Sequence, residues 1–262
     1  MKNRSGEKIK LASIDELLGV VNEESAMEIE ISKIHPFKNH PFKVLDDEKM
    51  QDLVESVKIN GVLTPVLLRM DENEEYEMVS GHRRMHAAQL AGLTTIPAIV
   101  RELSDDDAIV AMVDANIQRE ELLPSEKAFA YKMKLDAMKH QGQRTDLTSN
   151  PQGRKLVNKE TAQIVGEENG DSQTQVRRYV RLTYLVPELL EMVDEGRIKM
   201  RPAVEISYLD EDNQRDLVDA IDTEDCTPSH AQTIKMRKFF DEGKLSSDVI
   251  TSIMQEEEPN QK

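Results

Sequence analysis

The chain has no tryptophan, and aromatic residues make up only 4% of its 262 residues. Its single cysteine, Cys226, excludes a disulfide within one chain, so we expect the protein to work in a reducing compartment. It contains no run of 18 apolar residues, and its first residues lack the apolar segment of a signal peptide. These absences argue against secretion and membrane spanning, and we expect a cytoplasmic protein.

What the chain does have is charge, at 32% of residues, with 38% hydrophobic residues. This balance favours a helical, charge-covered protein with small aliphatic cores over one large core. The length suits two modest domains.

The net charge of -16 argues against non-specific binding of nucleic acid by the whole molecule. The charges are unevenly placed, however. Residues 127–181 hold 11 Lys and Arg against 6 Asp and Glu, whereas residues 202–262 hold 6 against 15. If nucleic acid binds, we expect it to bind at the basic stretch.

Short strand and helix patterns alternate over the first hundred residues, and no strand pattern follows residue 104. The sequence therefore predicts an α+β fold, in which a small mixed domain precedes an all-α domain. Residues 34–43 predict a loop bracketed by prolines, and Pro97 predicts an edge position for a strand over 95–100. The expected parts are a flexible arm over 1–27, a nucleotide-binding α+β domain over 28–103, a helical DNA-binding domain over 104–225 and a short acidic helical segment over 226–262.

One stretch combines a strand, a glycine turn and a helix with two early arginines. Tyr76–Val79 predicts the strand, Gly81 lies in the turn, and Gly92 ends the helix. Arg83 and Arg84 fall in the first helical turn, where the helix dipole disfavours cations. Backbone N–H groups at a helix start, a glycine and two guanidinium groups together suit a phosphate. The alternative is a solvated arginine pair on a surface helix.

Residues 161–181 have the layout of a helix-turn-helix, with its turn at Gly170 and a helix crossing at Ala162. The side chains expected to pack the two helices together are Ile164, Val165, Val176 and Val180. The side chains expected to face DNA are Ser172, Gln173, Thr174, Gln175, Arg177, Arg178 and Arg181. Gln and Arg can form bidentate contacts with base edges, so we predict sequence reading by the second helix. The alternative is an ordinary pair of helices with a polar outer face.

Three segments together resemble the ParB/RepB partition-protein family. They are residues 53–69, residues 79–97 around Gly81-His-Arg-Arg84, and residues 114–128 around Asn116-Ile-Gln-Arg119. A helix-turn-helix follows them, as in the family. The resemblance covers about residues 28–245 and extends to the order and spacing of the segments.

The resemblance implies a dimeric, nucleoid-associated protein that binds a centromere-like double-stranded DNA site and takes part in plasmid, chromosome or mobile-element segregation. It also implies CTP and Mg²⁺ as ligands, closure into a DNA clamp, and a ParA-like ATPase as a partner. The nucleotide-binding residues implied by the resemblance are Thr64, Gly81, His82, Arg83, Arg84, Asn116 and Arg119. Asn116 would lie near the metal.

Two positions depart from the family pattern. His82 stands where the family has a Glu that assists hydrolysis, and Ala115 stands where it has a metal-binding Glu. We therefore expect retained phosphate contacts but at most weak CTP hydrolysis. Two alternatives remain: a nucleotide-independent helix-turn-helix transcriptional regulator, and an ATP-using enzyme of the sulfiredoxin-like or serine-kinase-like type.

Overall fold

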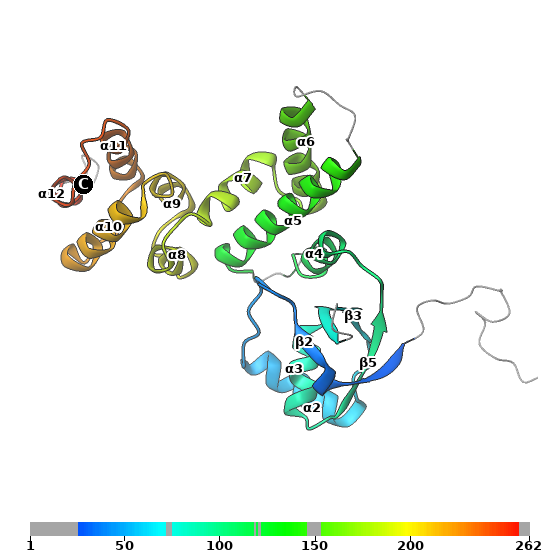
Figure 1. Cartoon of the computed structure of the whole chain (residues 1–262). Coiled ribbons are helices and arrows are strands. Elements are labelled where there is room, and N and C mark those ends of the chain that lie inside the picture. Colours follow the sequence, from blue (N-terminus) through cyan, green and yellow to red (C-terminus); the bar gives the residue numbers. More distant parts are fainter. Residues whose placement is uncertain (1–25, 72–74, 118, 120–121, 146–152, 257–262) are drawn as a thin grey trace, which may run out of the picture. The chain divides into compact units, whose positions relative to one another are not determined.

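The structure is a computed structural model that describes residues 26–71, 75–117, 119, 122–145 and 153–256 (Figure 1). The chain divides into two compact units. The first comprises residues 1–37 and 45–102, and the second comprises residues 38–44 and 103–262. Among the described helices, none is long and apolar enough to span a bilayer.

The first unit is built on a five-stranded mixed sheet with the strand order β1-β5-β3-β4-β2. The strands are β1 Met27–Glu30, β2 Ile34–Pro36, β3 Val66–Met70, β4 Tyr76–Ser80 and β5 Thr95–Val100, with the short 3-10 helix η1 at Ile31–Lys33. The β1–β5 and β3–β4 pairs are antiparallel, whereas β3–β5 and β2–β4 are parallel.

Two helices of the first unit, α2 Glu48–Asn60 and α3 His82–Leu90, lie together on one side of this sheet (Figure 1). The Asp47 side chain caps α2 by accepting a hydrogen bond from the Met50 amide at 2.8 Å, and the helix ends at Gly61. The fully buried core residues of this unit are Val66, Leu68, Met78, Val79, Ala87, Ala88, Ile96 and Ala98. Burial contributes about 1.5–3 kcal/mol for each Val, Leu, Ile or Met side chain of this core and about 0.8 kcal/mol for each alanine methyl group, which makes the sheet a rigid base for the loops at its ends.

The sequence prediction was wrong about two strands. The segment over 95–100 lies inside the sheet between β1 and β3, not at an edge. Pairing with β3 begins at Ala98, one residue after Pro97, so the missing N–H group leaves no gap in that ladder. The first three residues of the expected loop over 34–43 form β2, which pairs with β4 at the sheet edge.

Among its described residues, the regular elements of the second unit are all helices. Its helices are α4 Asp105–Asp114, α5 Pro124–Thr145, α6 Gly153–Glu168, α7 Gln173–Leu182, α8 Pro187–Asp194, α9 Met200–Ile206, α10 Glu211–Glu224, α11 His230–Asp241 and α12 Ser247–Met254. A mixed-sheet domain followed by helices is the predicted α+β fold class, which is confirmed.

One apolar cluster holds the C-terminal helices of this unit together. Leu182, Leu189 and Leu217 are fully buried in it, and Met236 of α11 and Ile250 of α12 belong to the same cluster. Helices α11 and α12 therefore share their core with α8–α10 and do not form a separate packed segment.

Candidate phosphate site and nucleic-acid interface

The turn between β4 and α3 requires glycine for two reasons. Gly81 has a φ of +110°, a backbone conformation that side-chain-bearing residues rarely adopt. A Cβ atom there would also lie 2.6 Å from Cγ1 of Val66, which is far inside van der Waals contact. The glycine thus lets the turn lie directly on β3, and α3 begins at the next residue.

Arg84 ties this helix start to the loop before β3. Its Nη1 donates hydrogen bonds to the carbonyl oxygens of Thr64 at 2.7 Å and Pro65 at 2.6 Å. Burial lowers the pKa of the Arg84 guanidinium. Its Nη2 lies 3.4 Å from the position that a Cβ atom on Gly81 would occupy. Three of the predicted nucleotide-binding positions, Thr64, Gly81 and Arg84, therefore lie together.

The two other predicted residues of this helix start have different surroundings. Arg83 Nη2 lies 3.5 Å from Oδ1 of Asp47, the carboxylate that caps α2, and its side chain is about one-third exposed. His82 is buried, with 6% of its surface exposed. Arg83 and Arg84 are therefore not equivalent, since one is near the surface beside a carboxylate and the other is engaged with two carbonyl groups.

Asn116 and Arg119 belong to the second unit. Asn116 is buried, and its Nδ2 donates to the Met112 carbonyl at 2.7 Å, at the end of α4. The Arg119 guanidinium lies 5.7 Å from the centre of the Phe42 ring. Both residues lie in a different unit from Gly81 and Arg84. Their contact with a nucleotide therefore stays a prediction, as does the contact of Asn116 with a metal ion.

Asp114, next to Ala115, takes part in an ion-pair cluster around the buried Lys134 side chain. The Lys134 ammonium is only 2% exposed and lies 2.5 Å from Asp114 Oδ1 and 2.6 Å from Glu168 Oε2. Burial alone would lower the pKa of Lys134, but the hydrogen bonds to the two carboxylates outweigh it and the pKa is raised. This cluster joins α4, α5 and α6, so the Asp114 carboxylate supports the helical scaffold.

Side chains of α5 hold the turn of the helix-turn-helix in place through contacts with Asp171. Asp171 Oδ2 accepts a hydrogen bond from the Tyr131 hydroxyl at 2.5 Å and lies 2.6 Å from the Lys127 ammonium. A Cβ atom on Gly166 would lie 2.5 Å from the Asp171 carbonyl oxygen, so only glycine lets the turn fold back this closely. Sequence reasoning placed Asp171 in the turn but missed its contacts with α5. It also missed the role of Gly166, although a glycine inside a helical pattern is itself a sign of close packing.

A capping box starts α7. Ser172 Oγ accepts from the Gln175 amide at 3.2 Å, and Gln175 Oε1 accepts from the Ser172 amide at 3.0 Å. Val176 and Val165 are fully buried and pack as predicted, whereas the prediction for Ile164 was wrong, because it is 43% exposed. Ile164 lies beside the inward face of α6 that carries Ala162 and Val165.

The predicted DNA-facing side chains differ in exposure: some form an exposed row on α7, whereas Arg181 packs against another helix. Thr174, Arg177 and Arg178 are exposed along one face of α7, with Gln175 beside them in the cap. Arg181 instead donates from Nε to Ser207 Oγ at 3.1 Å, and its guanidinium lies 3.9 Å from the Tyr208 ring centre. Arg181 thus packs α7 against the end of α9. Gln173 is partly buried.

A small mixed-sheet domain with a glycine-started helix, followed by a helix-turn-helix in an all-α unit, defines a two-domain protein of the helix-turn-helix class. Comparison with known protein families gives matches to two ParB domains. The ParB N-terminal domain family matches residues 18–117, and the ParB HTH domain family matches residues 154–237. The two matches together span more than half of the chain, and the chain belongs to the ParB family.

Individual relatives agree with this assignment. Stage 0 sporulation protein J of Bacillus subtilis is 36% identical over 180 residues, which are 69% of this chain and 56% of that protein. The chromosome-partitioning protein ParB of Myxococcus xanthus is 33% identical over 174 residues, 66% of this chain and 52% of that protein. The nucleoid occlusion protein of Listeria monocytogenes is 28% identical over 204 residues, 77% and 64% of the two chains. The chain thus spans between 52% and 64% of the length of these relatives.

Several solved structures are similar to this chain, and two of them are of one ParB protein. The C-terminally truncated ParB of Caulobacter crescentus complexed to the centromeric parS site has a TM-score of 0.45 and 24% identity, over 87% of this chain and 97% of that chain. The same truncated protein complexed with CTPγS has a TM-score of 0.34 and 27% identity, over 70% and 92% of the two chains.

Proposed function

We propose that this chain is a partitioning protein that binds a centromere-like DNA site through α7 and is regulated by CTP bound at the start of α3. It would serve the segregation of a chromosome, a plasmid or a mobile element. The observation that carries the DNA half of this proposal is the exposed row of Thr174, Arg177 and Arg178 on a capped, firmly seated helix.

The chemistry of this row suits sequence reading. Arg177 and Arg178 each present a planar guanidinium group, which can donate two parallel hydrogen bonds to O6 and N7 of guanine. The Thr174 hydroxyl, one turn earlier, can hold a phosphate or contact a base. Gln175 is occupied by the capping box, and Arg181 by Ser207 and Tyr208, so base reading falls mainly to the two exposed arginines.

The nucleotide half is supported by the first unit. No side chain caps the start of α3 at Gly81, and the Arg84 guanidinium lies beside that glycine with Thr64 next to it. A helix start together with an arginine suits a triphosphate. The choice of CTP comes from the family to which the chain belongs. Mg²⁺, a dimeric clamp and a ParA-like ATPase are part of the same proposal.

The experiment measures binding of a fluorescent parS duplex and of a scrambled duplex, with CTPγS as the nucleotide. Arg177→Ala and Arg178→Ala should each weaken parS binding by about 1–3 kcal/mol, or about 5–150-fold, and reduce the preference over the scrambled duplex. Arg215→Ala is the matched control, because Arg215 is an exposed arginine of α10 paired with Glu211. It should change affinity by less than about twofold.

The nucleotide arm uses calorimetry of CTPγS binding to the wild type, Arg84→Lys and Arg83→Ala. Both variants should bind more weakly, since each loses a guanidinium group near the helix start. If DNA binding persists but no nucleotide binds, the chain is a nucleotide-independent regulator. If ATP binds in preference to CTP and is turned over without DNA, the enzyme alternative is correct.

A further inference from the structure

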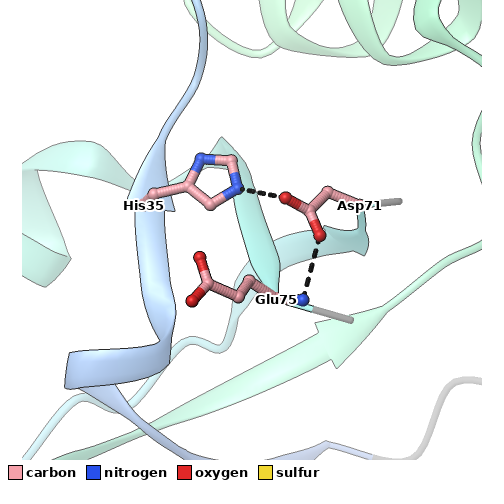
Figure 2. A group of neighbouring side chains, drawn as sticks. All are labelled: His35, Asp71 and Glu75. Carbon is pink, nitrogen blue, oxygen red and sulfur yellow. Dashed lines mark hydrogen bonds and ion pairs between the residues drawn. The ribbon is translucent and has the colours of Figure 1, made fainter. Parts of the chain in front are cut away.

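Three side chains with metal-ligand chemistry meet at one end of the sheet in the first unit (Figure 2). His35 comes from β2, Asp71 directly follows β3, and Glu75 directly precedes β4. One ligand atom of each lies within 4.8 Å of the others. The strand register places His35 opposite Glu77 and Met70 opposite Tyr76. By the two-residue alternation of strands, His35, Asp71 and Glu75 therefore project from the same face.

The end of the β3–β4 hairpin holds the Asp71 carboxylate in a fixed direction. The Asp71 amide donates to the Glu75 carbonyl at 2.8 Å, and the Glu75 amide donates back to Asp71 Oδ1 at 2.9 Å. The second carboxylate oxygen, Oδ2, then lies 3.1 Å from Nε2 of His35. A backbone amide thus orients this carboxylate toward His35, in the way that outer-shell hydrogen bonds orient metal-binding carboxylates.

The His35 ring faces an acceptor on each side. Its Nδ1 lies 3.2 Å from the Pro36 carbonyl oxygen, and its Nε2 faces Asp71 Oδ2. A neutral imidazole has one N–H group and can satisfy only one of these acceptors. If Nδ1 donates to the carbonyl, the Nε2 lone pair points at a carboxylate, and a cation between the two would remove the conflict. Metal-bound histidines typically donate their second ring nitrogen to a backbone carbonyl in this way.

We propose that His35, Asp71 and Glu75 form a binding site for a divalent ion of the zinc class. One imidazole nitrogen and two carboxylates suit Zn²⁺, which accepts nitrogen and oxygen ligands and keeps a fourth position for water. Mg²⁺ and Ca²⁺ prefer oxygen ligands alone, so the imidazole selects against them. On the same face, Arg69 pairs with Glu77, with Nη2 and Oε2 2.6 Å apart. The cation charge is therefore balanced by Asp71 and Glu75.

A bound ion would cross-link strands of the sheet. The edge strand β2 has only three residues and pairs with β4. An ion bound by one ligand from β2 and two from the β3–β4 hairpin would cross-link the edge to the sheet without any further backbone pairing. Binding to the folded state alone would then raise the stability of the first unit, and the gain would grow with the logarithm of the zinc concentration once that concentration exceeds Kd.

The test is equilibrium dialysis of the 262-residue chain against Zn²⁺ in excess Mg²⁺, with Co²⁺ absorption as a report on ligand geometry. We expect one Zn²⁺ per chain at this site, and a rise in Tm with added zinc. His35→Ala and Asp71→Asn should each weaken that binding at least about tenfold and abolish the rise in Tm. Asp71→Asn retains an acceptor for the Glu75 amide, so it keeps the hairpin bond.

The matched control is His86→Ala. His86 Nε2 lies 2.6 Å from Asp46 Oδ1, a similar pair, but no third ligand-type side chain joins it among the described residues. His86→Ala should keep the wild-type zinc stoichiometry and rise in Tm. Absence of zinc binding by the wild type, or equal binding by His35→Ala, would overturn the proposal and leave an ordinary imidazolium–carboxylate pair.

Discussion

At the scale of single residues, glycines with similar backbone angles have unequal importance. Gly81 and Gly92 both have positive φ, at +110° and +79°. A Cβ atom on Gly81 would collide with Val66, whereas a Cβ atom on Gly92 would meet nothing within 4 Å. Position 81 therefore has both a conformational and a packing requirement, and position 92 has only the first.

We predict that Gly81→Ala lowers the free energy of unfolding by about 2–5 kcal/mol, the sum of backbone strain and overpacking against β3. Gly92→Ala should lower it by only about 1–2 kcal/mol. Urea unfolding of the two variants beside the wild type measures the difference. Equal losses would mean that the Val66 side chain moves aside and that strain alone decides.

At the scale of elements, the helix-turn-helix depends on contacts that stop α7 from fraying. The Ser172–Gln175 box closes its first turn, and Asp171 anchors the preceding turn to Tyr131 and Lys127 of α5. The exposed arginines of α7 lie one turn beyond this cap. The cap therefore positions the exposed arginines of α7, although the side chains of the capping residues themselves hydrogen-bond to backbone amides.

Helix α11 has the same box, formed by Ser229 and Gln232. Removing each cap should cost about 1 kcal/mol of stability, so Ser172→Ala and Ser229→Ala form a matched pair. Only Ser172→Ala should also weaken binding of the parS duplex, by at most about the same energy, or about fivefold. Unfolding curves and fluorescence anisotropy test the two effects separately. A DNA defect of equal size in Ser229→Ala would show that it arises from general destabilisation.

At the scale of the whole molecule, carboxylates outnumber basic side chains by 50 to 34, yet neither of the two positions where the family resemblance implies a carboxylate holds one. Asp114 is paired with Lys134, and Ala115 has no ligand atom. His82, at the family's Glu position, is buried. Hydrolysis needs neutralised phosphate charge and an oriented water molecule, and these residues offer little for either.

We therefore predict slow or undetectable phosphate release from CTP in the presence of Mg²⁺ and cognate DNA, so that bound nucleotide persists. The double substitution His82→Glu with Ala115→Glu should raise the release rate and make it depend on Mg²⁺. A colorimetric phosphate assay with and without chelator measures both. Rapid, chelator-sensitive release by the wild type would show that another carboxylate holds the metal.

The sequence by itself determined the local turns and helices of this protein. The turn at Gly81, the helix after it and the turn at Gly170 could all be predicted, because each signal is contained within a few neighbouring residues. The order of the units, a mixed sheet and then helices, followed from the periodicity of apolar residues. The α+β class and the ParB family membership rest on these same patterns.

Only the tertiary structure decided which arginines are engaged in contacts within the protein and which are exposed. Arg84 and Arg181 are occupied by Thr64 and Ser207, whereas Arg178 stays exposed, and no local pattern distinguishes them. The interior place of β5 and the meeting of His35 with Asp71 likewise depend on strand register. Contacts between distant segments are set by how apolar faces pack against one another, and a window of sequence contains only one of the two faces.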